Sequence, residues 1–329
     1  PISPVPSDAD APVGFDRFVF DALYGPRGFY TSGGAAGRRG DFITSAEVGP
    51  LFAAVVARFL DSEWERAGRP DRFAVYEVGA GPGTLARGIG TAGAACAPAL
   101  EYHAVEISGV QRERHPDGVK SLASLPEGEL RGVVLANELL DNLPFRLAVY
   151  DGGWREAFVA GGAEVLSARF DPVPSALPVV ADHGARAPLV DAAARWVDDV
   201  LGRLAGTLVL FDYFAPTTAG LAARPWRDWL RTYRGHERGG HYLDEPGTQD
   251  ITCEVPIDQL PSADTIRSQA QWLALHGIDE LVAEGRAVWA EQAARPGLEA
   301  LRMRSRVSEA EALCDQEGLG GFTVCEWRR

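Results

Sequence analysis

Three glycines at alternate positions are the clearest chemical pattern in this 329-residue sequence. Gly79, Gly81 and Gly83 follow the apolar run 73–78 and precede a segment with helical character. Glycine has no Cβ, so the backbone can bend sharply there and pass close to a ligand. A helix that begins after such a turn directs its N-terminal dipole at the same ligand. The pattern predicts a strand, a tight turn and a helix that together bind a small molecule.

The spacing of the glycines and the nearby acids indicate which molecule this is. Dinucleotide-binding turns have the order G-x-G-x-x-G and hold a pyrophosphate, whereas the order here is G-x-G-x-G, with Glu77 just ahead of it. An acid there would repel a pyrophosphate but suits the ammonium end of S-adenosylmethionine (SAM), and Glu106, after the next apolar run, can accept hydrogen bonds from ribose hydroxyls. We therefore predict a SAM site that consists of Glu77, Gly79, Gly81, Gly83, Thr84, Leu85, Glu106, Ile107 and Asn137. The alternative is a structural glycine-rich turn beside two surface acids.

Polar side chains follow the apolar run that ends at Ala136. Asn137, Glu138 and Asp141 would lie at the carboxyl edge of a doubly wound sheet, where such sheets bind ligands. Methyl transfer needs a nucleophile held in line with the methyl group. The Asn137 carbonyl could orient an N–H group, and the two carboxylates could hold a cation or take a proton. The alternative is that Asp141 caps a helix and Glu138 is only structural.

The segment 216–258 shows no clear period, yet it is rich in aromatic residues and arginine. A loop of that length in a folded protein is either functional or disordered, and the aromatic residues favour function. Residues 233–236 could form a lid that excludes water, which makes His236 a catalytic candidate beside the alternative of a plain surface histidine. The other histidines and the four cysteines lack the spacing of a metal site, so we predict no metal and reduced thiols.

These residues need a scaffold in which strands and helices alternate. Short apolar runs predict strands and amphipathic patterns predict helices. The strands are expected at 73–78, 102–106, 132–137, 145–150, 154–159, 207–213 and 322–327, and helices at about 50–67 and 188–204. The alternation predicts an α/β fold with a doubly wound, mostly parallel, Rossmann-like sheet.

The same pass along the chain predicts its domain organisation. We expect a flexible N-terminal segment at 1–14, without the features of a signal peptide. A SAM-binding domain with an N-terminal helical part should follow at 15–215. A lid loop and a helical insertion on the substrate side are expected at 216–317, and the closing strand of the sheet at 318–329.

The charge balance restricts the partners. The chain has 46 acidic residues against 32 Lys and Arg, a formal net charge of −14. Such a surface repels phosphate backbones, so no nucleic-acid partner is expected. No apolar run reaches the roughly 18 residues of a membrane span. We expect a cytoplasmic protein that acts on a protein or a small molecule, with a homodimer as one option for its assembly.

Several segments together resemble the MidA-like class I methyltransferases. They are Gly40 to Ser45, Glu77 to Leu85, Ala136-Asn137-Glu138 with Asp141 and Pro144, Tyr233 to His236, Asp250-Ile251-Thr252 and Arg304 to Val307. The resemblance extends from about Phe15 to Trp327. It implies a seven-stranded sheet with a helical insertion. It also implies that Gly40, Asp41, Thr44 and Ser45 fold over the cofactor.

The resemblance also implies a reaction. Mitochondrial members of the family dimethylate an arginine of a respiratory complex I subunit, and an acidic pocket at Glu138 and Asp141 is compatible with arginine. Where many members have His and Asp after the Asp-x-Thr segment, this chain has Glu254 and Pro256, so its substrate can differ. We therefore expect N-methylation of a protein arginine. The alternatives are N- or O-methylation of a small molecule, or a SAM-binding assembly factor that acts mainly by holding a partner.

Overall fold

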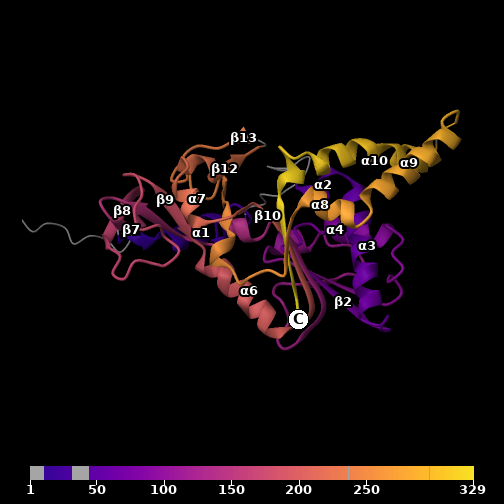
Figure 1. Cartoon of the computed structure of the whole chain (residues 1–329), viewed down its shortest axis with the longest axis horizontal. Helices are drawn as coiled ribbons and strands as arrows, with labels where there is room; N and C mark the ends of the chain where they lie inside the picture. The colour runs from indigo at the N-terminus through magenta and orange to yellow at the C-terminus, as the bar shows by residue number, and fades with distance from the viewer. Residues whose placement is uncertain (1–10, 32–43, 236, 296) are drawn as a thin grey trace, which may run out of the picture. The chain divides into compact units, whose positions relative to one another are not determined.

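The computed structural model describes residues 11–31, 44–235, 237–295 and 297–329 (Figure 1). The chain divides into two units, each assembled from three separate segments. One unit comprises Pro1–Gly34, Leu140–Asp199 and Tyr213–Ser262, and we term it the antiparallel unit. The other comprises Ala35–Leu139, Val200–Asp212 and Ala263–Arg329, and we term it the parallel-sheet unit.

A seven-stranded sheet forms the centre of the parallel-sheet unit. Its order is β16-β17-β10-β5-β2-β3-β4, and its strands are β2 (Phe73–Val78), β3 (Leu100–Val105), β4 (Lys120–Leu122), β5 (Leu130–Asn137), β10 (Leu204–Asp212), β16 (Thr265–Ser268) and β17 (Thr323–Arg328). The strands from β10 to β4 pair in parallel, whereas β17 is antiparallel to both of its neighbours. This is the predicted mostly parallel sheet.

Helices complete the hydrophobic core of this unit. They are α2 (Ser45–Val48), α3 (Pro50–Arg66), α4 (Thr84–Thr91), α5 (Gly109–Arg112), α8 (Gln269–Leu275), α9 (Ile278–Gln292) and α10 (Leu298–Cys314). Pro50 occupies the first turn of α3, where its missing N–H costs nothing. The apolar stripe of α3 packs with residues of α4, α8, α9 and α10 and with strands β2, β5 and β10 in one buried cluster. Helices α9 and α10 run side by side (Figure 1).

The antiparallel unit contains three small sheets. A five-stranded sheet has the order β1-β7-β6-β9 with β8 beside β7, a second pairs β11 with β15, and a third has the order β13-β12-β14. The strands are β1 (Val13–Gly14), β6 (Arg146–Tyr150), β7 (Trp154–Ala160), β8 (Ala163–Arg169), β9 (Arg186–Leu189), β11 (Phe214–Ala215), β12 (Leu230–Arg234), β13 (Glu237–Arg238), β14 (Asp250–Cys253) and β15 (Val255–Pro256). Its helices are α1 (Phe15–Tyr24) and α7 (Thr218–Ala222), and α6 (Asp191–Arg203) begins in this unit and ends in the other. Trp154 and Leu189 belong to a separate buried cluster within the unit.

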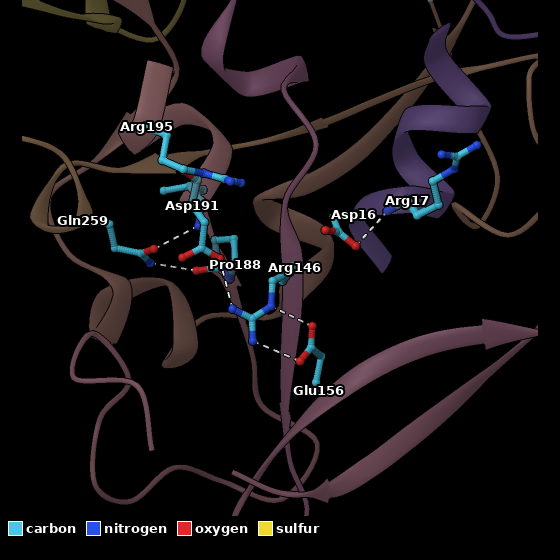
Figure 2. Close-up of polar contacts among 9 residues, drawn as sticks. Asp16, Arg17, Arg146, Glu156, Pro188, Asp191, Arg195 and Gln259 are labelled. Carbon is cyan, nitrogen blue, oxygen red and sulfur yellow. Dashed lines mark hydrogen bonds and ion pairs between the residues drawn. The ribbon is translucent and has the colours of Figure 1, made fainter. Parts of the chain in front are cut away.

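Arg146 links the five-stranded sheet to the start of α6. Its guanidinium donates from Nε and Nη2 to Glu156 on β7 at 2.7 and 3.0 Å, and from Nη1 to Asp191 at 3.1 Å (Figure 2). Gln259 holds the adjoining backbone, because it accepts from the Val190 N–H at 2.9 Å and donates to the Pro188 carbonyl at 2.8 Å. The paired bonds between one planar guanidinium and one carboxylate fix the orientation of both groups.

The structure differs from the expected elements in three places. The segment 216–258 is not one long loop, since it contains α7 and strands β12 to β15. These strands have two to five residues, which is too short for an alternating pattern to be recognised. Residues 13–14, expected to be flexible, pair with β7, while residues 1–10 lie outside the described residues. The predicted helix 188–204 begins only at Asp191, because β9 occupies 186–189.

Candidate cofactor and active site

The glycines, the acids and the amide of the predicted site all lie at one edge of the parallel sheet. Strands β2, β3, β5 and β10 are neighbours and run in the same direction. Their carboxyl ends lead into the glycine turn, into Glu106, into Asn137–Glu138 and into Asp212 respectively. Parallel sheets bind ligands at this edge, so the sheet topology gathers residues that lie far apart in the sequence.

The glycine turn has the backbone conformation that its composition predicts. Gly79, Gly81 and Gly83 have φ of +73°, +51° and +76°, a region that favours glycine. A Cβ at Gly83 would lie 2.9 Å from the Pro116 side chain, so the position has no room for one. A Cβ at Gly81 would meet nothing within 4 Å. The chain therefore passes Gly81 beside open space, which suits a ligand close to the backbone.

Glu106 fixes the loop on the opposite side of the turn. Its Oε2 accepts a hydrogen bond from the Gly81 N–H at 2.9 Å, and its Oε1 accepts one from the Ser108 N–H at 2.8 Å. Each carboxylate oxygen has more than one acceptor site, so hydrogen bonds from a ribose can be added to these. Ile107, the next residue, has a side chain with an exposed fraction of 59%. An apolar side chain exposed beside the acid that is predicted to bind ribose suits the face of an adenine.

Glu77 is an almost fully buried acid at the end of β2. Tyr102 on β3 donates its hydroxyl to Glu77 Oε2 at 2.9 Å. The pKa of Glu77 is raised to about 8, chiefly by burial and also by the negative charge of Glu106, while the Tyr102 hydrogen bond and Arg87 act in the opposite direction. Two acids held together in a buried place are stabilised by a cation, so the electrostatics of this turn favour a positively charged ligand.

The other predicted cofactor residues differ in their surroundings. Thr84 starts α4 directly after the turn, and its hydroxyl accepts a hydrogen bond from Arg87 Nη2 at 3.3 Å. Leu85 is 2% exposed and belongs to the core, so its side chain supports the turn. Ser45 is fully buried and donates to Gln269 Oε1 at 2.8 Å, and Thr44 is the N-cap of α2. Gly40 and Asp41 lie outside the described residues.

Asn137 and Glu138 form an ordered polar pair at the end of β5. The Asn137 amide donates from Nδ2 to Glu138 Oε1 at 3.1 Å. Asn137 Oδ1 is buried and has no hydrogen-bond partner among the residues that the structure describes. Glu138 has φ of +56°, and its N–H donates to the Phe211 carbonyl at 2.8 Å. A buried acceptor without a partner and a strained backbone are both typical of functional sites.

Asp141 belongs to a buried polar cluster in the antiparallel unit. Thr252 donates to Asp141 Oδ2 at 2.6 Å, and the Asn142 amide and the Tyr30 hydroxyl each lie 3.1 Å from Asp250 Oδ1. Burial raises the pKa of Asp250 to about 7, and the charge of Asp141 raises it as well, while hydrogen bonds from Tyr30 and Asn142 lower it. The structure therefore places Asn137 and Glu138 in one unit and Asp141 in the other.

Three side chains that were not among the predicted site residues hold the glycine turn and the neighbouring loop together. Ala104 is the register partner of Glu77, and Tyr102 lies two residues before Ala104 on the same strand. The Tyr102 and Glu77 side chains are therefore on the same face of the sheet. Alternation along the two strands could have revealed that pair. Arg112 donates to the Glu106 and Ile107 carbonyls at 2.7 and 2.8 Å, and His115 Nε2 lies 2.9 Å from the Gly81 carbonyl. No spacing in the sequence indicates the contacts of Arg112 and His115, because they depend on how the loops pack in the folded chain.

The remaining predictions concern His236, metal binding, a membrane span and the departure from the family pattern at Glu254. His236 lies outside the described residues. In the described ranges, no group of three or more His, Cys, Asp or Glu side chains could hold a metal ion. In the same ranges, no helix is both long and apolar enough to cross a membrane. Glu254, at the position where the family's pattern has His, accepts hydrogen bonds from Arg224 and Arg231.

Sequence comparison identifies a family and curated relatives. The model of the S-adenosyl-L-methionine-dependent methyltransferase family Methyltransf_28 matches residues 55–275. The protein arginine methyltransferase NDUFAF7 homolog of Drosophila melanogaster is 26% identical over 297 residues, which cover 74% of this chain and 64% of that protein. The mitochondrial protein arginine methyltransferase NDUFAF7 of Mus musculus is also 26% identical, over 76% of this chain and 65% of that protein. The chain thus spans slightly less than two thirds of the length of these relatives.

Structure comparison points the same way. A COG1565 superfamily member from Burkholderia thailandensis, crystallised with S-adenosyl-homocysteine, is 30% identical, with a TM-score of 0.80 over 97% of this chain and 88% of that chain. A native crystal structure of a COG1565 superfamily protein from the same organism is 28% identical, with a TM-score of 0.78. Both likenesses extend over nearly the whole chain, so they include the two units described above.

Proposed function

The chain belongs to the Methyltransf_28 family of SAM-dependent methyltransferases, and from that premise we propose that it transfers methyl groups from SAM to an arginine side chain of a protein. The family match and the solved relatives confirm the predicted family, the fold class and SAM as the cofactor. The individual site residues remain predictions. The acceptor is the part that we propose here.

The observation that carries the proposal is the pair Asn137 and Glu138. A guanidinium presents several N–H donors in a plane and needs acceptors that hold it. Asn137 Oδ1 is a buried acceptor without a partner in the described chain, and Glu138 is oriented by the Asn137 amide. The names of the curated relatives, which are protein arginine methyltransferases, support the same acceptor.

The residues of the parallel-sheet unit fit SAM, and different residues have different roles in the proposed reaction. SAM supplies a methyl group on a positively charged sulfur. Glu77 and Glu106 stabilise positive charge near the glycine turn, and Glu106 can also accept from ribose hydroxyls. Asn137 Oδ1 would accept an N–H of the guanidinium and so orient the lone pair of its neighbouring nitrogen. Glu138 would hold the guanidinium and take the proton that its nitrogen loses when it gains a methyl group.

The proposal is tested by methylation of peptides that differ in one residue. The protein is incubated with radiolabelled SAM and peptides that contain arginine, lysine or neither, and mass spectrometry counts the added methyl groups. We expect methyl transfer to the arginine peptides only. Transfer to lysine, or to none of the peptides while small amines or hydroxyls are methylated, would contradict the proposal.

A pair of variants separates catalysis from cofactor binding. Glu138→Gln should lower kcat/KM by about 10²-fold or more, as expected for loss of a general base, while S-adenosylhomocysteine binding measured by calorimetry stays the same. Glu127→Gln changes an exposed carboxylate of the same unit and serves as the matched control with unchanged kcat/KM. An equal loss of activity in both variants would remove Glu138 from the proposed mechanism.

A further inference from the structure

A cavity in the antiparallel unit has no role in the methyl transfer described above. It has a volume of about 310 Å³, at the small end of the range of about 300–1,000 Å³ that is typical of ligand pockets. The lining residues that matter to its chemistry are Trp226, Arg227, Arg231, Arg238, His241 and Tyr242. All of them belong to the segment Tyr213–Ser262 of that unit.

The charge of this pocket is opposite to that of the whole protein. Three arginines line it, although the chain has a formal net charge of −14. Arg231 is neutralised by Glu254, its Nη2 lying 2.7 Å from Glu254 Oε1. Arg227 and Arg238 form no ion pair with a carboxylate anywhere in 11–31, 44–235, 237–295 or 297–329. Two positive charges therefore remain available to a ligand.

Aromatic rings form a wall beside these charges. The Arg227 guanidinium lies 4.3 Å from the centroid of the Trp226 ring, and the ring centroids of Trp226 and Tyr242 are 5.5 Å apart. A guanidinium stacked on an indole is held in a defined plane, with its N–H groups pointing outward at the ring's edge. A guanidinium in such a position can donate two parallel hydrogen bonds to one oxyanion.

His241 reports on the electrostatic potential inside the pocket. Burial lowers its pKa, and the positive charges of Arg227 and Arg186 lower it further, whereas Asp244 and Glu164 raise it. Glu164 is itself bound by Arg186 and Tyr242, and the Asp244 carboxylate accepts a hydrogen bond from the backbone N–H of His241 at 2.8 Å. These two acids are therefore engaged in contacts of their own, and the arginines face the cavity.

We propose that this pocket binds an oxyanion, a carboxylate or a phosphate. The anion can be an acidic side chain of a polypeptide or a free small molecule, since both present the same chemistry to Arg227 and Arg238. The residues that line this pocket include none of those assigned above to SAM binding or methyl transfer.

The test uses small probes that differ only in charge. Fluorine-labelled benzoate, phenyl phosphate and neutral benzamide are titrated into the full chain, and binding is followed by ¹⁹F NMR. We expect benzoate or phenyl phosphate to bind and benzamide not to bind. The double variant Arg227→Gln/Arg238→Gln should weaken anion binding at least about ten-fold, because each arginine contributes a charge-assisted hydrogen bond. Equal binding of the neutral probe, or undiminished binding by the double variant, would overturn the proposal.

Further arms control for charge, folding and the source of the anion. Arg286→Gln on α9 removes an exposed positive charge in the other unit and should leave anion binding unchanged. Arg227→Lys keeps the charge but loses the planar fork, so it should weaken binding less than Arg227→Gln. Circular dichroism verifies that each variant is folded. A glutamate peptide that binds more tightly than benzoate and its glutamine counterpart identifies a polypeptide ligand, whereas tighter binding of phenyl phosphate identifies a small phosphorylated one.

Discussion

Glu77 is a residue whose ionisation should change when the cofactor binds. Its pKa is raised to about 8, chiefly by burial, so at neutral pH most free protein carries it protonated. A cationic ligand favours the ionised form and thereby lowers this pKa. Binding of SAM must then release a proton below about pH 8, and its affinity must rise with pH in that range.

We expect SAM binding near pH 7 to release up to about one proton per molecule. Calorimetry in two buffers of different ionisation enthalpy measures this number directly. Glu77→Gln removes the ionisable carboxyl group, so the variant should bind SAM more weakly and without releasing a proton. If the variant releases as many protons as the native chain, another group is responsible and Glu77 does not face the cofactor.

The left-handed backbone at Glu138 leads to a second prediction. A non-glycine residue in this conformation costs about 1–2 kcal/mol relative to glycine, and Glu138 has φ of +56°. Glu138→Gly should therefore be more stable than Glu138→Ala by about 1 kcal/mol, although both lack the carboxylate and should be equally inactive. Chemical denaturation measures the difference. Equal stability of the two variants would mean that the surrounding loop relaxes and stores no strain.

The sequence predicts the cofactor turn better than it predicts the acceptor site. Glycines and acids in the turn act through backbone conformation and through neighbours in the chain, so their spacing carries the information. Asp141 illustrates the limit, since its partner Thr252 is contributed by a segment about a hundred positions away. His115 illustrates it again, because its contact with the Gly81 carbonyl depends on packing and not on any local pattern.

At the scale of elements, two strands approach each other through paired glycines. Gly132 on β5 and Gly206 on β10 are register partners with φ of +113° and +151°. A Cβ at Gly206 would lie 1.9 Å from the Gly132 carbonyl oxygen, and one at Gly132 would lie 2.1 Å from the Ala74 carbonyl oxygen. Backbone atoms cannot move aside as a flexible side chain can, so the centre of the sheet requires glycine at both positions.

We expect Gly206→Ala to lower the free energy of unfolding by more than about 2 kcal/mol, since a steric clash adds to an unfavourable φ. Gly202→Ala is the matched control. Gly202 lies in α6 with nothing within 4 Å of its Cβ position, so the change should be neutral or stabilising by up to about 1 kcal/mol. Thermal unfolding of the two variants compares them, and similar melting temperatures would contradict the argument.

The elements of the parallel sheet were predictable because their strands are long and apolar. Strands β2, β5 and β10 are buried over most of their length and read as continuous apolar runs. In the segment 216–258, by contrast, β13 and β15 have two residues each, and two of the five residues of β12 are arginines. Strands that short are stabilised by their neighbours in space, so a pattern within the segment does not reveal them.

At the scale of the whole molecule, buried acids should make the free protein less stable as the pH rises. The pKa of Glu77 is raised from 4.5 to about 8, and that of Asp250 from 3.8 to about 7. Between the unfolded and the folded pKa of each acid, the folded protein binds more protons than the unfolded chain. Its stability therefore falls as the pH rises through that range. His276, whose pKa is lowered from 6.5 to about 4, acts in the opposite direction but only below its unfolded value.

The melting temperature of the ligand-free protein should therefore fall between about pH 6.5 and pH 8. Glu77→Gln should flatten this dependence, and so should Asp250→Asn over the lower part of the range. Saturating SAM should reduce the slope, since a bound cation compensates the charge of Glu77. A melting temperature that rises across this range would show that both acids ionise at ordinary pKa values.

The path of the chain has a consequence for how the protein is synthesised. The chain passes between the two units at positions 34, 139, 199, 212 and 262, so neither unit is a continuous stretch that a ribosome could release and fold first. In the seven-stranded sheet, β17 lies between β10 and β16 although it is the last strand in the sequence. While residues 323–328 remain in the ribosomal exit tunnel, β10 exposes an unpaired apolar edge. Until residues 323–328 emerge and the sheet closes, this edge is an aggregation-prone surface of the nascent chain.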